Sequence, residues 1–221
     1  RGESQAPAIS RQFSTCLFGD RSVESRVPGT GVSSVADAYA MISSTHKRRC
    51  EKPLNLADLA RQCRSNLLES VIPFWTRHSV DWKHGGYFSC LDRDGTVYDP
   101  RKYIWLQGRQ IWMYSRLYNQ VERRQEWLDI AALGVEFLTR HACDPEGRYY
   151  FRLSREGAPS FFQRKPYSAV FAVMALAEFS RTGAGSQYRS AAIELFWRVL
   201  EWIANPALLG RGPMPGQPPF Q

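Results

Sequence analysis

Tyr103-Ile-Trp-Leu-Gln-Gly-Arg-Gln-Ile-Trp-Met-Tyr-Ser-Arg-Leu-Tyr118 is the stretch of sequence that decides the fold. A helix built from it has apolar side chains on nearly every side, a pattern typical of a helix covered by neighbours all round. We therefore expect this helix to be buried. Residues 166–180 show the same pattern, through Tyr167, Val170, Phe171, Val173, Met174, Leu176 and Phe179.

Three other segments have a single apolar stripe, which indicates helices that bury only one face. The first begins after Leu54, with Asn55 as its N-cap. The second covers residues 124–141 and the third covers residues 186–204. Along the chain the predicted helices alternate as outer, inner, outer, inner, outer.

Two related segments, 84–95 and 146–157, separate outer from inner helices. A shift of 62 residues aligns Gly85 with Gly147, Tyr87 with Tyr149, Leu91 with Leu153, Arg93 with Arg155 and Gly95 with Gly157. Alternating residues followed by Asp-Gly or Glu-Gly predict a hairpin in each segment. The repeat of helix, hairpin and helix predicts an all-α fold, an incomplete (α/α)6 toroid or barrel with short β-hairpins between helices.

The domain organisation follows from composition. Residues 1–52 are rich in serine and lack periodicity, so we expect a low-complexity, disordered leader. Residues 53–210 form the partial barrel domain of about five helices. Residues 211–221 are rich in proline and glycine, and we interpret them as a truncated end that forms no packed terminus. Five helices cannot close a ring, so we interpret the chain as a fragment.

Composition excludes several functions for the 221 residues. The net charge of +8 is spread along the chain and accompanies no nucleic-acid motif, so no nucleic-acid partner is expected. No apolar run reaches 18 residues, so no membrane partner is expected either. Five widely spaced cysteines without a Cys-x-x-Cys pair indicate a reduced, cytoplasmic location and no metal site.

Arg109 is the most informative polar residue. Trp105 and Trp112 stand four residues before it and three after it, so all three share one face of a helix. A guanidinium in so apolar a helix requires a partner. One hypothesis is that Arg109 donates hydrogen bonds to a small polar substrate while an indole packs against it. The other is a structural ion pair with a carboxylate on a neighbouring helix.

The segment His84-Gly-Gly-Tyr-Phe, the Asp-Arg-Asp-Gly turn and residues 102–118 closely resemble the N-acylglucosamine 2-epimerase family, also called renin-binding proteins. The resemblance covers about residues 55–215. It implies an (α/α)6 barrel and the interconversion of N-acetylglucosamine and N-acetylmannosamine in amino sugar metabolism. It also implies activation by ATP or a related nucleotide with no required cofactor, a homodimer, and association with renin.

The resemblance further implies site residues. Arg109 matches the substrate-binding arginine of the family, and Trp105 and Tyr103 match aromatic positions near its pocket. The family uses two catalytic histidines from the C-terminal half of its chain, beyond Gln221, so no catalytic residue is assigned here. We expect His46, His78, His84 and His141 to be ordinary surface or hairpin histidines, and the fragment to be inactive.

One departure from the family lies at Ala169, near a position that the family fills with an acidic residue. Glu178 remains close to it, whereas Glu194 falls on an outer helix and is expected to be solvated. Two alternatives stay open. The chain could be a non-catalytic protein that binds renin or a sister subunit, or another α/α-barrel sugar epimerase or isomerase, such as a cellobiose or mannose enzyme.

Overall fold

The structure is a computed structural model that describes residues 55–210 and 212–217. It divides into two units, Arg1–Leu67 and Leu68–Gln221. The predicted leader, residues 1–52, lies outside the described residues, as do Arg211 and residues 218–221.

The described part of the first unit is helical. Helix α2 (Leu56–Ser65) begins after Asn55, whose side chain accepts hydrogen bonds from the backbone N–H groups of Ala57 and Asp58. The predicted N-cap is therefore confirmed. No residue of α2 is buried, so its apolar stripe does not form a core here. A π-helical segment, η2 (Asn66–Val71), follows α2 and contains the boundary between the units.

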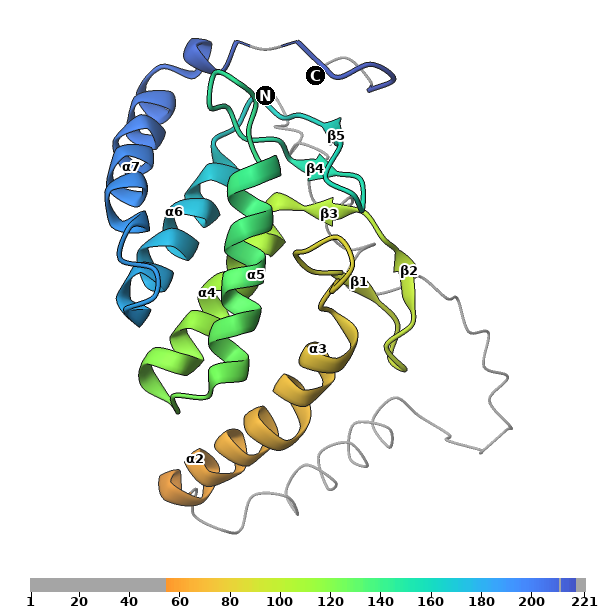
Figure 1. Ribbon diagram of the computed structural model, residues 1–221, viewed down its shortest axis with the longest axis vertical. Helices are drawn as coiled ribbons and strands as arrows, with labels where there is room; N and C mark the ends of the chain where they lie inside the picture. Colours follow the sequence, from red (N-terminus) through yellow and green to blue (C-terminus); the bar gives the residue numbers. More distant parts are fainter. Residues whose placement is uncertain (1–54, 211, 218–221) are drawn as a thin grey trace, which may run out of the picture. The chain divides into compact units, whose positions relative to one another are not determined.

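The described part of the second unit contains five α-helices, and Figure 1 shows their order. They are α3 (Ile72–His78), α4 (Ile104–Gln120), α5 (Gln125–His141), α6 (Tyr167–Phe179) and α7 (Tyr188–Ala204), with short 3-10 turns η3 (Ser180–Thr182) and η4 (Pro206–Leu209). Helix α4 packs against α5 and α6, and α6 packs against α7. The predicted alternation is confirmed from α4 to α7, where α5 and α7 each bury a single stripe, but not for the first predicted outer helix, because α2 buries no residue.

The outer helices bury the stripes that the sequence predicts. Helix α5 buries Trp127, Leu128, Ile130, Ala131, Gly134, Val135, Phe137 and Leu138. Helix α7 buries Ala192, Leu195, Val199 and Trp202. The other face of α7 is exposed although it is also apolar, and it presents Ile193, Phe196, Trp197, Leu200 and Ile203.

The prediction that α4 is buried on all sides is wrong. Arg109 is exposed and Trp112 is 36% exposed. Helix α4 packs against α5 and α6, and in the described part of the chain the face that carries Arg109 and Trp112 remains exposed. Helix α6 is likewise open at Tyr167, which is 43% exposed, and at Met174. The two apolar helices therefore share an uncovered surface in the described part of the chain.

A glycine allows α4 and α6 to approach closely. A Cβ atom at Gly108 would lie 2.6 Å from the carbonyl oxygen of Phe171, closer than a side chain can be placed. The backbones can therefore come together only because position 108 has no side chain. Trp105, one turn earlier on α4, contacts Tyr167 and Phe171 of α6.

Both predicted hairpins are present. Strands β1 (Cys90–Leu91) and β2 (Val97–Asp99) form one, and β4 (Arg152–Leu153) and β5 (Pro159–Phe161) form the other. Gly95 and Gly157 lie in the turns with φ of 89° and 99°, a conformation that favours glycine. A short strand β3 (Lys102–Tyr103) pairs with β4, opposing Lys102 to Leu153 and Tyr103 to Arg152. The sequence pattern did not predict β3, which makes a three-stranded sheet.

The described residues near the C-terminal end are packed. The side-chain amide of Gln217 accepts a hydrogen bond from the backbone N–H of Phe162 at 2.9 Å and donates one to its carbonyl oxygen at 2.7 Å. Met214 packs against the core. The expectation that this run forms no packed terminus is therefore wrong for Met214 and Gln217, whereas residues 212, 213, 215 and 216 are exposed.

Among the described residues, none of the helices has the length and apolar character needed to span a membrane.

Candidate functional site

Arg109 and Trp105 lie together on the uncovered face of α4. The guanidinium carbon of Arg109 lies 5.8 Å from the centre of the Trp105 ring system, within range of a cation–π interaction. No carboxylate pairs with Arg109 within residues 55–210 and 212–217. The ion-pair alternative therefore finds no support there, and the N–H donors of Arg109 are free to face a ligand.

Two aromatic residues of α6 extend this face. The ring of Trp105 lies 5.9 Å from Tyr167 and 5.7 Å from Phe171, measured between ring centres. Tyr167 and Phe171 also pack edge to face at 5.1 Å. We call Trp105, Arg109, Tyr167 and Phe171 the Arg109 cluster. It combines flat apolar surface with a planar set of hydrogen-bond donors, as sites for polar ring-shaped ligands do.

Tyr103 makes different contacts from the other two predicted site residues. It ends β3, its hydroxyl group donates a hydrogen bond to Oδ2 of Asp99 at 3.5 Å, and its ring packs against Phe151 at 5.7 Å. Burial raises the pKa of Tyr103, while a hydrogen bond with Arg152 opposes the shift. The structure brings Arg109 and Trp105 into contact and gives Tyr103 separate partners one residue before α4 begins.

Ala169 is completely buried on α6, so the site has no acidic side chain at that position. Glu178 is also buried, and its carboxylate accepts hydrogen bonds from Asn119 at 2.9 Å and from Arg116 at 3.5 Å. Glu178 is thus committed to α4 rather than to Arg109. Glu194 is exposed on α7, as predicted.

The two histidines that end outer helices have matching structural surroundings. His78 packs against Phe74 and His141 against Phe137, each with ring centres 5.0 Å apart. A Cβ atom at Gly95 would overlap the His78 ring, and one at Gly157 would overlap the His141 ring. Each imidazole therefore fills the space that a turn glycine leaves. Burial lowers the pKa of His141, with further lowering by Arg140 and Lys102.

A buried ion pair supports the start of α4, and sequence reasoning missed it. Nζ of Lys102 lies 3.0 Å from Oδ2 of Asp81 and 2.5 Å from the carbonyl oxygen of Gly85. The side chains of Lys102 and Asp81 are 0% and 1% exposed. Arg155 donates two further hydrogen bonds to the Asp81 carboxylate, at 3.0 and 3.1 Å. This clamp of Asp81, Lys102 and Arg155 joins both hairpin segments to β3.

The electrostatics of the clamp follow from its geometry. Burial raises the pKa of Asp81, but hydrogen bonds from Arg155 and Lys102 outweigh it and lower the value from 3.8 to about 2. Burial lowers the pKa of Lys102, and the hydrogen bond to Asp81 opposes that shift. The sequence contains one hint of this arrangement. Asp144 stands 63 positions after Asp81, in the loop before the second hairpin, and its carboxylate accepts a hydrogen bond from the backbone N–H of Arg148.

Gln107 was also missed. It is completely buried, its Oε1 accepts the backbone N–H of Tyr87, and its Nε2 donates to the Tyr87 carbonyl oxygen, both at 2.8 Å. Gln107 therefore fixes the loop before the first hairpin to α4, two residues before Arg109.

Comparisons with solved structures give the class. The chain is similar to a sugar epimerase from a ruminal bacterium, with 27% identity and a TM-score of 0.56, over 65% of this chain and 36% of that one. It is also similar to cellobiose 2-epimerase from Bacillus thermoamylovorans, with 25% identity and a TM-score of 0.59, over 68% of this chain and 38% of that one. The fold is that of the (α/α)6-barrel sugar epimerases.

Sequence comparisons assign the chain to one family within this class. The family model for N-acylglucosamine 2-epimerase matches residues 86–207. The chain is 45% identical over 156 residues to N-acylglucosamine 2-epimerase of Bos taurus and 47% identical over 154 residues to that of Mus musculus, covering 68% and 67% of this chain. The chain belongs to the N-acylglucosamine 2-epimerase family. It spans 37% of the length of each of these two relatives.

Proposed function

We propose that this chain supplies part of the sugar site of an N-acylglucosamine 2-epimerase, which interconverts N-acetylglucosamine and N-acetylmannosamine. Arg109 is exposed, has no carboxylate partner among the described residues and packs against Trp105, and this observation supports the proposed function most directly. A guanidinium donates several hydrogen bonds in one plane to sugar oxygens, and an indole covers the apolar face of a sugar ring.

The reaction requires a proton to leave C2 of the open-chain sugar on one face and to return on the other. Two acid–base groups must therefore flank that carbon. The described histidines have other positions, since His78 and His141 fill the space beside turn glycines. We therefore propose that Arg109 and Trp105 bind and orient the sugar and that the chain by itself does not catalyse its epimerisation.

The degree of similarity supports an N-acylated amino sugar over a disaccharide substrate. Identity to the mammalian N-acylglucosamine 2-epimerases is 42–47%. Identity to the cellobiose 2-epimerase of Dictyoglomus turgidum is 27%.

A homodimer is part of the proposal, and the exposed apolar face of α7 supports it. Phe196, Trp197 and Leu200 are 42%, 61% and 40% exposed, which is unusual for neighbouring side chains on one helix. Activation by ATP, association with renin, a cytoplasmic location and a role in amino sugar metabolism are proposed from the family resemblance alone.

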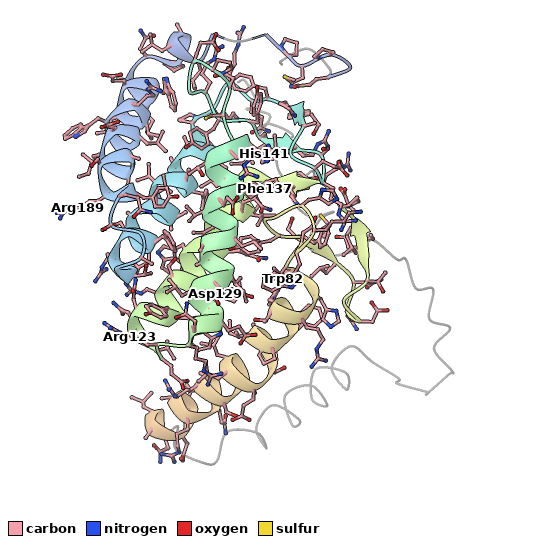
Figure 2. The ribbon with its side chains drawn as sticks, in the orientation of Figure 1. Trp82, Arg123, Asp129, Phe137, His141 and Arg189 are labelled. Carbon is pink, nitrogen blue, oxygen red and sulfur yellow. The ribbon has the colours of Figure 1, made fainter. Side chains whose placement is uncertain are left out.

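Binding of N-acetylmannosamine to the purified chain tests the site. Titration calorimetry would compare the unmodified chain with Arg109→Gln and with Arg189→Gln, a matched control on α7 (Figure 2). We expect Arg109→Gln to weaken binding about tenfold, because charge-assisted hydrogen bonds are lost, and Arg189→Gln to leave it unchanged. Equal affinity in all three proteins would show that Arg109 does not contact the sugar.

A further inference from the structure

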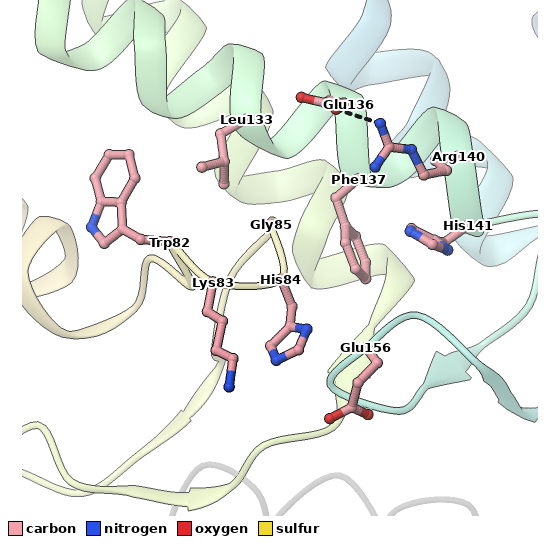
Figure 3. A pocket seen from close by; sticks show the side chains of 10 residues that line it. All are labelled: Trp82, Lys83, His84, Gly85, Leu133, Glu136, Phe137, Arg140, His141 and Glu156. Carbon is pink, nitrogen blue, oxygen red and sulfur yellow. Dashed lines mark hydrogen bonds and ion pairs between the residues drawn. The ribbon is translucent and has the colours of Figure 1, made fainter.

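A pocket lies away from the Arg109 cluster and shares no residue with it. Its volume is about 490 Å³, and Figure 3 shows its side chains. The loop before the first hairpin forms one wall, the second half of α5 forms another, and the second hairpin turn contributes the last residue. The lining comprises Trp82, Lys83, His84, Gly85, Leu133, Glu136, Phe137, Arg140, His141 and Glu156.

The loop that presents Lys83 and His84 is held rigidly. The Asp81 carboxylate accepts the backbone N–H groups of Lys83 and His84 at 3.2 and 3.3 Å. The backbone N–H of Gly85 donates to the Asp81 carbonyl oxygen at 2.8 Å. The backbone from which the side chains of Lys83 and His84 extend is therefore fixed before a ligand arrives, which reduces the entropy lost on binding.

The carboxylates of the pocket already have partners, whereas one cation has none. Glu136 forms an ion pair with Arg140 at 2.5 Å, and Glu156 accepts a hydrogen bond from the hydroxyl of Ser154 at 2.9 Å. Lys83 is exposed, and within residues 55–210 and 212–217 no carboxylate pairs with it. The Glu136–Arg140 pair is itself exposed, 65% at each side chain, so it contributes little and can release Arg140 to a ligand.

Positive charge is also in excess beneath the pocket. Lys102 and Arg155 share the single carboxylate of Asp81. Lys102 touches two lining residues, through the carbonyl oxygen of Gly85 at 2.5 Å and the ring of Phe137, whose centre is 4.3 Å from Nζ. Glu156 of the lining offsets part of this charge, because it acts on both Lys102 and Arg155. When the four charged lining residues are counted together with Asp81, Lys102 and Arg155, positive charges exceed negative charges by one.

Two groups on the pocket wall have lowered pKa values to which positive charges contribute. Burial lowers the pKa of His141, and the charges of Arg140 and Lys102 lower it further. Hydrogen bonds from its own backbone N–H and from Ser154 lower the pKa of Glu156, and the charges of His84 and Arg155 add to this. Nearby positive charges are therefore a secondary cause of both shifts, after burial at His141 and hydrogen bonds at Glu156.

The rim of the pocket offers an apolar surface. The indole of Trp82 is 65% exposed, and Leu133 and Phe137 line the opposite wall. Figure 3 shows Lys83 and His84 extending from the loop in the same direction, with Glu156 facing His84. An anionic group beside Lys83 can therefore be joined to a planar group that covers the indole.

We propose that this pocket binds a small organic anion, a monophosphate or carboxylate joined to a planar apolar group, with Lys83 and Arg140 as the charged contacts and Trp82 as the stacking surface. The site is separate from the Arg109 cluster and goes beyond the proposed sugar chemistry.

Phenyl phosphate, benzoate, methyl phosphate and phenol are the probes, titrated calorimetrically into the full chain at low ionic strength. Phenyl phosphate and benzoate distinguish the two anionic groups. Methyl phosphate removes the planar group and phenol removes the charge. The variants are Lys83→Gln, Trp82→Ala and Lys165→Gln, in which an exposed lysine outside the pocket is lost with the same change of charge. Thermal melts establish that each variant is folded.

We expect saturable binding of phenyl phosphate or benzoate, weakened about three- to tenfold by Lys83→Gln and within twofold of the unmodified chain in Lys165→Gln. Trp82→Ala should remove the preference for phenyl phosphate over methyl phosphate. Failure of both phenyl phosphate and benzoate to saturate, equal weakening by the two lysine variants, or equal binding of phenol would overturn the proposal. None of these outcomes changes what N-acetylmannosamine binding says of Arg109.

Discussion

The ammonium group of Lys102 lies 3.0 Å from the carboxylate of Asp81, and both side chains are almost completely removed from solvent. The two residues are 21 positions apart in sequence. Because Lys102 belongs to β3 and Asp81 to the loop before the first hairpin, the contact fixes the hairpin segment to the strand from which α4 begins. The stability of this part of the chain therefore depends on a charged pair inside the fold.

Replacing Lys102 with methionine should destabilise the chain by about 1–3 kcal/mol, because the buried Asp81 carboxylate loses its ammonium partner and keeps only Arg155. Urea unfolding followed by circular dichroism measures this. The double variant Asp81→Asn with Lys102→Met should recover part of the loss, since no charge is then left buried. Lys165→Met, at an exposed lysine, is the matched control and should change the free energy of unfolding by less than about 0.5 kcal/mol.

Acid should expose the contribution of Asp81. Its pKa is about 2 in the folded chain against an ordinary value of 3.8, so the folded state holds the carboxylate more firmly ionised than the unfolded state does. The resulting stabilisation, about 2 kcal/mol, is complete above pH 3.8 and is lost as the pH falls through about 2. Unfolding free energies from pH 6 to pH 2 should therefore fall more steeply for the unmodified chain than for Asp81→Asn. Parallel curves would contradict the assignment.

Gly157→Ala should destabilise the chain by about 1–3 kcal/mol, because φ is 99° and the added Cβ atom would lie 2.5 Å from Nδ1 of His141. Thermal melts give the loss. Adding His141→Ala should relieve the steric part and leave the backbone strain. The control is Gly212→Ala, where a Cβ atom meets nothing within 4 Å; a comparable loss there would mean that the turn geometry is not the cause.

The chain alone should not exchange the C2 proton of N-acetylmannosamine. A positioned base contributes roughly 10²–10⁴ in rate, and none of the described histidines contacts the Arg109 cluster. Incubation in heavy water, with and without ATP, followed by proton NMR at C2 tests this. Deuterium incorporation faster than in buffer would show that the chain contains a working base.

The sequence predicted the helices well, because periodicity reports which face of a helix is apolar. It predicted the burial of Arg109 incorrectly, since an apolar pattern on all sides does not show that a neighbour covers each side. Helix α4 is covered by α5 and α6, and Arg109 stands on the remaining face. The predicted contact between Arg109 and Trp105 is confirmed, because both residues belong to one helix and their spacing alone places them on the same face.

Residues that depend on distant partners were missed. Arg155 reaches Asp81 across 74 positions, and Lys102 is placed by the pairing of β3 with β4. Neither pairing follows from periodicity within one segment. Gln217 is similar, because its clasp on Phe162 requires the chain to return over 55 residues.

The burial of Lys102 gives its amine a distinctive chemical reactivity. Among the described lysines, Lys83 and Lys165 are exposed, whereas the Lys102 side chain is 0% exposed. An amine-acylating reagent should therefore label Lys83 and Lys165 within seconds and reach Lys102 only in molecules whose clamp has opened. Mass spectrometry of the peptide that contains Lys102 gives the rate of its acylation. This rate measures how often the clamp opens in folded molecules.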